Sequence, residues 1–386
     1  MNALSLKDLK AKQFFTKFLF LDGGYVLLAP ETPVSEELVK RLMQWEFREL
    51  LTDGVAVDTV VEASQSVGEE SGSGEAVLAL ADGTGDRERI ESIGAILATF
   101  TDYVESVYTR FVTKTELEFK EIMDKTKIIC ELVVDNRRYV LRALSTSQQN
   151  KNYLVSHSVR SAILSIILGS ALKLPPFRLI ELGAAAIVHE IGMVRLPPQL
   201  YMAGRQLSPV ERKSITAHPV LGYNLLKERQ VPLAVCLSAL EHHERMNGSG
   251  YPRGLTGDKI SLYSRIIMVA CSYDAVTANR PFKQAKDGNA GMLEILRNEG
   301  KQYDDTVIRS LVYSLSIYPI GTIVLLTNGK PALVVDVNPD NPRYPLVQLV
   351  GAKSPDGKDI VVATAETGVR ILRVLSREEI EKAAKA

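Results

Sequence analysis

The chain has 386 residues, of which 46% are hydrophobic and 24% are charged, and its 46 basic side chains balance its 46 acidic ones. This length is enough for two or three domains, each with its own core. The balanced charge argues against a nucleic acid polymer as partner, and no apolar run is long enough to span a membrane.

The cysteines and the N-terminus indicate where the protein works. Cys130, Cys236 and Cys271 are far apart and show no C-x-x-C spacing, which is typical of a reducing compartment. No signal peptide opens the chain. We therefore expect a cytoplasmic protein.

Residues 1–61 are expected to form a small α+β unit. Two apolar runs around a DGG turn within residues 13–30 predict a β-hairpin, and an apolar stripe behind a plausible N-cap at Ser35 predicts a short helix. Residues 62–87 are rich in Gly, Ser and acidic side chains, which predicts a flexible linker.

Residues 88–144 have a helical hydrophobic pattern. The first part of this segment repeats apolar residues in alternating steps of four and three, which is a heptad pattern. One interpretation is a long helix that pairs with its copy in a homodimer, and the other is a helix that packs on its own domain. The repeat consists of Ile93, Leu97, Phe100, Val104, Val107 and Phe111.

Residues 319–386 change to a period of two. The run GTIVLLTNGKPALVVDVN predicts a hairpin around Asn328-Gly329, and Asp356-Gly357 marks another turn. The chain is thus expected to end in a small β module with a charged helical tail.

All the histidines lie in the remaining segment, residues 145–318, which has the pattern of helices joined by short loops. Taken singly, each has an ordinary structural interpretation, such as capping the last carbonyls of a helix. Together they predict one metal or acid–base site, because imidazole is the commonest metal ligand and titrates near neutrality. They are His157, His189, His218, His242 and His243.

This segment resembles the HD-GYP family, a branch of the HD metal-dependent phosphohydrolases. The resemblance is carried by His189-Glu190 and by the runs HPVLGYNLL, HHERMNGSGYPRGLTGDKI and SRIIMVACSYDAVTANRPF. It implies a mainly α protein with an all-helical HD-GYP domain. It also implies a bacterial signal-transduction phosphodiesterase that uses two divalent metal ions, iron or manganese, to hydrolyse cyclic di-GMP to the linear dinucleotide or GMP.

The resemblance also implies roles for single residues, with Glu190 bridging a first metal to a second. The metal ligands would be His157, His189, Glu190, His218, His242, His243 and Cys271. The catalytic group would be His189, Glu190 and His243. The substrate contacts would be Tyr251, Arg280 and Lys283.

Four positions depart from the family pattern. Glu190 replaces the Asp of the HD pair, and Cys271 replaces a later metal-binding Asp with a sulfur that suits manganese poorly. Met193 replaces a Lys, and Tyr153 replaces a carboxylate that some members use for a third metal. Two metals are therefore expected rather than three.

Three functions follow from this mixture. The retained histidines favour a working cyclic di-GMP phosphodiesterase, whereas Glu190, Cys271 and Met193 together favour a catalytically impaired receptor or signalling scaffold. The third is a hydrolase of another phosphodiester. The expected partners are cyclic di-GMP, a second copy bound through residues 88–144, and a GGDEF-domain or other signalling protein.

Overall fold

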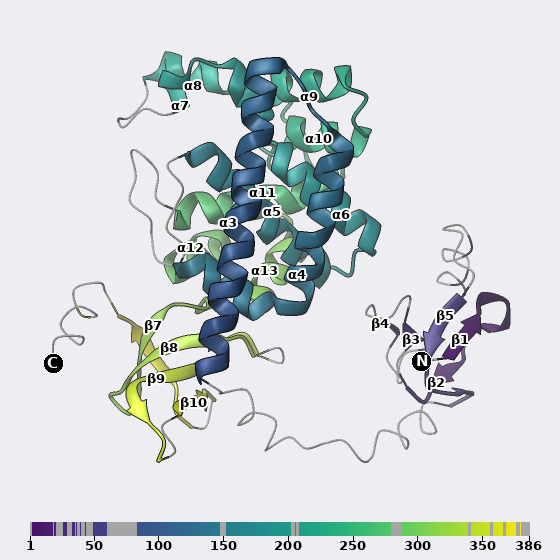
Figure 1. Cartoon of the computed structure of the whole chain (residues 1–386), viewed down its shortest axis with the longest axis vertical. Coiled ribbons are helices and arrows are strands. Elements are labelled where there is room, and N and C mark those ends of the chain that lie inside the picture. The colour runs from purple at the N-terminus through teal and green to yellow at the C-terminus, as the bar shows by residue number, and fades with distance from the viewer. Residues whose placement is uncertain are drawn as a thin grey trace. The chain divides into compact units, whose positions relative to one another are not determined.

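The computed structural model of the chain contains two compact units, Met1–Leu80 and Ala81–Ala386 (Figure 1). The residues that it describes are 2–17, 19–20, 26–28, 33–34, 36, 39, 43, 49–59, 83–146, 152–201, 205, 208–278, 288–298, 300–338, 341–355, 358–365, 368–375 and 379.

The first unit is built on short antiparallel strands. Its four-stranded sheet has the order β1-β5-β3-β4, and a separate pair joins β2 to β6. The pairing of β3 with β4 confirms the predicted hairpin, whose turn lies outside the described residues, as does most of the helix predicted after Ser35. The elements are β1 (Asn2–Ser5), η1 (Leu6–Asp8), β2 (Phe14–Phe15), β3 (Leu19–Phe20), β4 (Val26–Leu28), β5 (Glu49–Thr52) and β6 (Ala56–Val57).

The second unit opens with two long helices, α3 (Gly83–Lys114) and α4 (Phe119–Thr146). The helix α3 begins inside the segment that composition predicts to be a linker. Its first turn is held by the carboxylate of Asp86, which lies 3.2 Å from an Arg138 nitrogen and 3.1 Å from an Arg142 nitrogen, both on α4. These ion pairs join positions more than 50 residues apart, so local composition could not predict them.

The heptad seam of α3 is buried within its own unit. All six of its residues are at most 6% exposed and belong to the core shared with α4 and the following helices. The interpretation in which the helix packs on its own domain is therefore the arrangement found, and this seam is not available to a second copy.

The helices that follow surround α5 (Tyr153–Ala171), which packs against α4, α6, α11 and α13. Among the described residues α5 alone has the length and composition of a membrane span, but 78% of its 18-residue apolar window is buried inside the protein. The other helices are α6 (Pro176–Val188), η2 (Ile191–Arg195), α7 (Pro198–Tyr201), α8 (Pro209–Ile215), α9 (His218–Glu228), α10 (Leu233–Glu241), η3 (Gly257–Lys259), α11 (Leu262–Thr277), α12 (Gly288–Arg297) and α13 (Asp305–Leu315).

The C-terminal strands form one five-stranded antiparallel sheet of order β10-β9-β8-β7-β11. The hairpin predicted around Asn328-Gly329 is confirmed, with Gly329 at φ +77° between β7 and β8. The turn at Asp356-Gly357 and most of the tail lie outside the described residues. The strands are β7 (Ile323–Leu326), β8 (Pro331–Asp336), β9 (Leu346–Lys353), β10 (Asp359–Ala363) and β11 (Ile371–Val374). The mainly α fold with a small C-terminal β module agrees with the sequence prediction.

The buried seam leads to a prediction about stability and assembly. Leu97→Ala should lower the free energy of unfolding by about 2–5 kcal/mol, because it opens a cavity between α3 and its neighbours. Ile96→Ala, at an exposed neighbouring position, is the matched control and should change it little. Urea denaturation and analytical ultracentrifugation measure both effects. An oligomer that dissociates on Leu97→Ala while the subunit keeps its stability would show that the seam joins two copies.

Candidate metal centre

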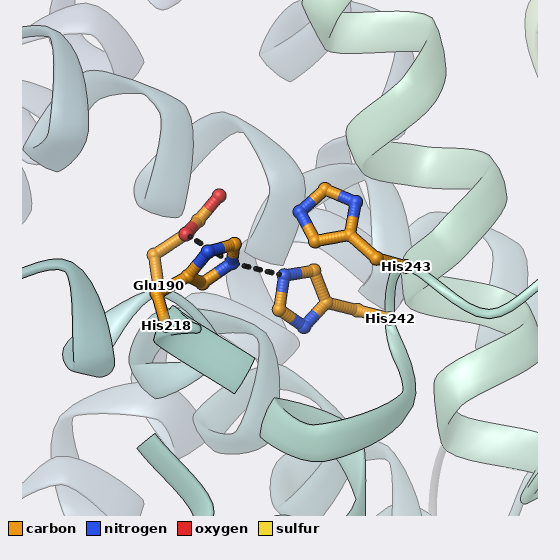
Figure 2. A group of neighbouring side chains, drawn as sticks. All are labelled: Glu190, His218, His242 and His243. Carbon is orange, nitrogen blue, oxygen red and sulfur yellow. Dashed lines mark hydrogen bonds and ion pairs between the residues drawn. The ribbon is translucent and has the colours of Figure 1, made fainter. Parts of the chain in front are cut away.

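Five histidines and one glutamate meet where several helices begin or end. His157 lies in the second turn of α5, and His218 is the first residue of α9. His189 directly follows α6, with Glu190 next to it, and His242 directly follows α10, with His243 next to it. Figure 2 shows Glu190 beside the ring of His218, with the rings of His242 and His243 on the other side of His218. The predicted cluster is therefore brought together by helix termini from distant parts of the chain.

Three of the rings are oriented by the backbone in the same way. The Nδ1 atoms of His189, His218 and His242 lie 2.7, 2.7 and 2.9 Å from the carbonyl oxygens of Ala186, Ile215 and Ala239, in each case three residues earlier. A carbonyl can only accept, so each Nδ1 carries the proton and donates it. In the neutral form of such a ring the Nε2 atom is left with its lone pair, which is the form that binds a metal.

His157 is oriented by a carboxylate instead. Its Nδ1 atom lies 2.7 Å from Oδ2 of Asp274 on α11, and the other oxygen of Asp274 accepts from Nε of Arg160. Asp274 is fully buried, and burial alone would raise its pKa. Arg160 and His157 outweigh burial and hold the pKa of Asp274 below its ordinary value. The Asp274 carboxylate therefore remains ionised and accepts the hydrogen bond from His157 Nδ1, which directs the His157 Nε2 atom toward Glu190.

Glu190 is the member common to two groups of potential ligands. One group is His157, His189 and Glu190, and the other is Glu190, His218, His242 and His243. One Glu190 oxygen lies 3.9 Å from both the His157 and the His189 Nε2 atoms, and the other lies 3.2 Å from His218 Nε2. This is the geometry of a carboxylate that can bridge two metal positions.

The charge state of the cluster also suits divalent cations. Burial lowers the pKa of His189 to about 4 and holds the pKa values of His242 and His243 well below their ordinary range. Burial would raise the pKa of Glu190, but His218 and the other imidazoles lower it to about 2. At neutral pH Glu190 is thus an anion and His189, His242 and His243 are neutral, which is the protonation state that metal binding requires.

The buried acceptor atoms without a donor show most directly whether these residues fit a bound metal. The Nε2 atoms of His218 and His242 lie only 3.1 Å apart, although both rings use their Nδ1 protons elsewhere. Within the described residues, His189 Nε2 and Glu190 Oε2 are buried without a hydrogen-bond partner. Converging acceptors with no donor between them repel each other, and a shared cation removes that repulsion. The residues present therefore fit a bound metal.

A glycine allows this close approach. A Cβ atom at Gly192 would lie 2.0 Å from the His218 carbonyl oxygen and 2.6 Å from the Gly222 backbone nitrogen. Only a residue without a side chain lets η2, which follows Glu190, pack so closely on the start of α9. Gly192 thus sets the separation between Glu190 and His218.

The GSGYP loop is anchored by a carboxylate that the sequence analysis did not single out. Glu244 is fully buried and accepts hydrogen bonds from the backbone nitrogens of Arg253 and Leu255, at 2.8 and 2.9 Å. Tyr251 stacks on His243, with ring centroids 4.7 Å apart and planes 17° apart. Burial raises the pKa of Tyr251, so its phenol stays protonated. The loop therefore presents an aromatic surface at the half-buried edge of the cluster.

Other predicted residues have different placements. The Cys271 thiol is buried and lies 3.4 Å from the Met268 carbonyl oxygen, and Cys271 belongs to neither of the two ligand groups, so its predicted role as a ligand stays a prediction. Asp274, one turn later on α11, is the side chain that reaches His157. Tyr153 stacks on His157 with centroids 5.6 Å apart. Arg280 and Lys283 lie outside the described residues.

Asp274 should support both folding and metal binding. Asp274→Asn leaves Arg160 without its ionic partner, and we expect it to cost about 3–5 kcal/mol of stability. Loss of this outer partner of His157 should also weaken metal binding by about 10–100-fold. Thermal unfolding and a Mn²⁺ titration of the folded protein measure the two effects.

Asp304→Asn is the control for this change, because it removes another Arg-paired carboxylate, bonded to Arg265 at 2.8 Å. It should leave Mn²⁺ affinity unchanged. Equal loss of affinity in both variants would contradict the role given to Asp274.

Gly192→Ala should push η2 away from α9 and separate Glu190 from His218. We expect lower stability and a weakened second metal position, measured by metal content after dialysis. Gly94→Ala, in α3 where an added Cβ meets nothing within 4 Å, should stabilise the protein by about 0.5–1 kcal/mol and retain full metal content. Full metal content in Gly192→Ala would show that this contact does not set the site.

Comparisons with known proteins agree with this architecture. A family model described as "HD domain" matches residues 144–307. The chain is 30% identical over 237 residues to cyclic di-GMP phosphodiesterase PdeB of Borreliella burgdorferi, covering 60% of this chain and 62% of that protein. It is 33% identical over 197 residues to cyclic di-GMP phosphodiesterase PA4108 of Pseudomonas aeruginosa, covering 51% and 47%.

A third relative, the 3'3'-cGAMP-specific phosphodiesterase 3 of Vibrio cholerae, is 29% identical and covers 43% of this chain and 36% of its own length. The chain thus matches less than two thirds of each of these relatives. Among solved structures, Bd1817, an HDG"Y"P protein from Bdellovibrio bacteriovorus, has a TM-score of 0.50 at 17% identity, covering 80% of this chain and 97% of that one. Residues 144–307 therefore match the HD domain family, and the chain is similar to proteins of the HD-GYP type.

Proposed function

We propose that this protein is a metal-dependent phosphodiesterase that hydrolyses cyclic di-GMP to the linear dinucleotide or GMP in the bacterial cytoplasm. The observation that carries the proposal is the bridging position of Glu190, with imidazole Nε2 atoms directed at both of its oxygens. The names of the relatives from Borreliella and Pseudomonas support the choice of substrate.

The ligand set supports two divalent ions, iron or manganese. His157 and His189 would hold the first, His218 and His242 the second, and Glu190 would bridge them. Imidazole and carboxylate ligands suit these metals. Two such ions polarise a phosphodiester and lower the pKa of a bound water. His189 and Glu190 belong in this proposal to the catalytic group because they lie at its centre.

His243 would act at the substrate side of the site. It is half-buried, stacked on Tyr251, and close enough to Glu190 and His218 to serve as a ligand. Burial and His218 keep its pKa well below the ordinary value, so the ring is neutral at neutral pH and can accept a proton. Tyr251 would contact the nucleotide, together with Arg280 and Lys283 as predicted from the sequence.

A receptor or scaffold is the second candidate, and the presence of Glu190, Cys271 and Met193 in place of the expected Asp, Asp and Lys favours it. If Cys271 supplies no ligand, the centre has one protein ligand fewer than the resemblance implies, and Glu190 is one methylene longer than the expected Asp. Such a site would bind cyclic di-GMP without rapid turnover. The relative from Vibrio cholerae adds 3'3'-cGAMP to the substrates that a test must include.

A second copy of the chain and a GGDEF-domain protein remain proposed partners. Because the α3 seam is buried, a homodimer through α3 and α4 would use their outward faces. Exposed apolar residues on these faces are Ile96, Val112, Ile128 and Val134.

Chromatography of cyclic di-GMP and 3'3'-cGAMP, incubated with anaerobic protein loaded with Fe²⁺ or Mn²⁺, tests the proposal. We expect linear dinucleotide or GMP from the wild type. His189→Ala should lose both bound metal and turnover. Its loss of metal affinity should exceed the decrease of about 10–100-fold that follows from changing a residue outside the ligand shell.

Phe177→Ala, at an exposed position on α6, is the control and should keep full activity. Intact cyclic di-GMP in every metal state would contradict the phosphodiesterase proposal, and tight binding without turnover would establish the receptor. Turnover that survives His189→Ala would exclude the metal centre as its source.

A further inference from the structure

The helix α3 lies outside the matched HD domain but contacts the elements that carry the metal ligands. Tyr108 on α3 reaches both α5 and the end of α6. Arg229, at the end of α9, donates to the Thr115 carbonyl oxygen at 3.0 Å, just beyond α3, and its guanidinium lies 4.7 Å from the Phe111 ring centroid. Figure 1 shows α3 running along the helical domain from the C-terminal sheet toward α9.

The hydroxyl group of Tyr108 makes two buried hydrogen bonds. It lies 3.0 Å from the Ile187 carbonyl oxygen and 3.0 Å from Ser158 Oγ. The carbonyl can only accept, so the single phenolic proton is donated to Ile187 and Ser158 donates to the phenol oxygen. Burial raises the pKa of Tyr108, so this donor persists at every physiological pH.

These two partners are sequence neighbours of metal ligands. Ser158 directly follows His157, and Ile187 lies two residues before His189 and three before Glu190. The Ile187 carbonyl is in the last turn of α6, where helix carbonyls lose their intrahelical partners. One hydroxyl group therefore links the backbone that presents His189 and Glu190 to the helix that presents His157.

We propose that Tyr108 is a positioning residue of the metal centre, and that through it α3 sets the location of His189 and Glu190 relative to His157. The inference rests on the proposed metal-dependent function. The Nε2 atoms of His157 and His189 are equidistant from one Glu190 oxygen, at 3.9 Å. Metal–ligand distances are met to within about 0.2 Å, so a small shift at the end of α6 weakens the first metal position.

The other end of α3 joins this centre to the rest of the unit. Asp86 in its first turn pairs with Arg138 and Arg142 of α4, and Arg138 also lies 3.6 Å from Asp336 at the end of β8. A displacement of α3 caused at this end would be transmitted to Tyr108, because the helix between them is continuous.

Tyr108→Phe tests the proposal, since it keeps the buried ring and removes only the hydroxyl group. The full-length protein is stripped of metal and titrated with Mn²⁺, with free ion and spin-coupled pairs followed by electron paramagnetic resonance. We expect about 10–100-fold weaker binding of one Mn²⁺ and loss of the spin-coupled signal. Ser158→Ala keeps the hydrogen bond from Tyr108 to the Ile187 carbonyl and should therefore weaken Mn²⁺ binding less than Tyr108→Phe does. It is the alternative test if Tyr108→Phe does not fold.

Tyr103→Phe is the matched control, because it makes the same chemical change on the same helix where the ring faces Lys125 of α4. It should bind Mn²⁺ like the wild type. Unchanged affinity in folded Tyr108→Phe and in Ser158→Ala, or equal loss in Tyr103→Phe, would overturn the proposal. The titration contains no nucleotide, so a wild type that binds Mn²⁺ but leaves cyclic di-GMP intact would contradict the proposed function alone.

Discussion

The structure of the site depends on one buried carboxylate surrounded by imidazoles. Glu190 is 8% exposed, and His157, His189 and His218 all present their Nε2 atoms to it within 4 Å. Burying an anion is unfavourable unless positive charge or donors compensate. The Nδ1 protons of the rings are committed to backbone carbonyls and to Asp274, so a ring in its neutral form has no donor left for Glu190. A cation is the remaining partner that satisfies both the carboxylate and the lone pairs.

The helical scaffold holds the Glu190 carboxylate and the imidazole Nε2 atoms close together, although all of them are hydrogen-bond acceptors. Three rings are fixed by carbonyls at helix ends, the fourth by Asp274 and Arg160, and Gly192 lets two of the ligand-bearing segments touch. Tyr108 adds a hydrogen bond from a helix that precedes the HD domain. Each of these supports lies outside the ligand set, yet each determines where a ligand atom points, which is the usual function of the outer shell in metal proteins.

Much of this could be predicted from the sequence, for identifiable reasons. Clustered histidines and the GSGYP run are local signals, and their spacing along the chain predicts a shared site. The interpretation of His189 as a ring that caps helix carbonyls also describes the structure, because the same ring caps with Nδ1 and offers Nε2 to a metal. The structural and functional interpretations of one histidine were therefore compatible.

The contacts that sequence reasoning missed are those between distant positions. Asp274 meets His157 across 117 residues, and Tyr108 meets Ile187 across 79. The heptad repeat indicates which face of α3 is buried. It does not indicate whether a second copy of the chain or the helix's own domain covers that face, because both arrangements require the same hydrophobic periodicity. Cys271 occupies the motif position of an expected metal-binding Asp, and the phase of α11 places Asp274, three residues later, against His157.

The most direct test of a bridging Glu190 is a crystal structure of the protein loaded with Mn²⁺, with data collected at the manganese absorption edge. Our account predicts two anomalous peaks about 3.5–4 Å apart, with the Glu190 carboxylate between them and His157, His189, His218 and His242 bound through Nε2. A single peak, a pair that Glu190 does not join, or the absence of bound metal would contradict it.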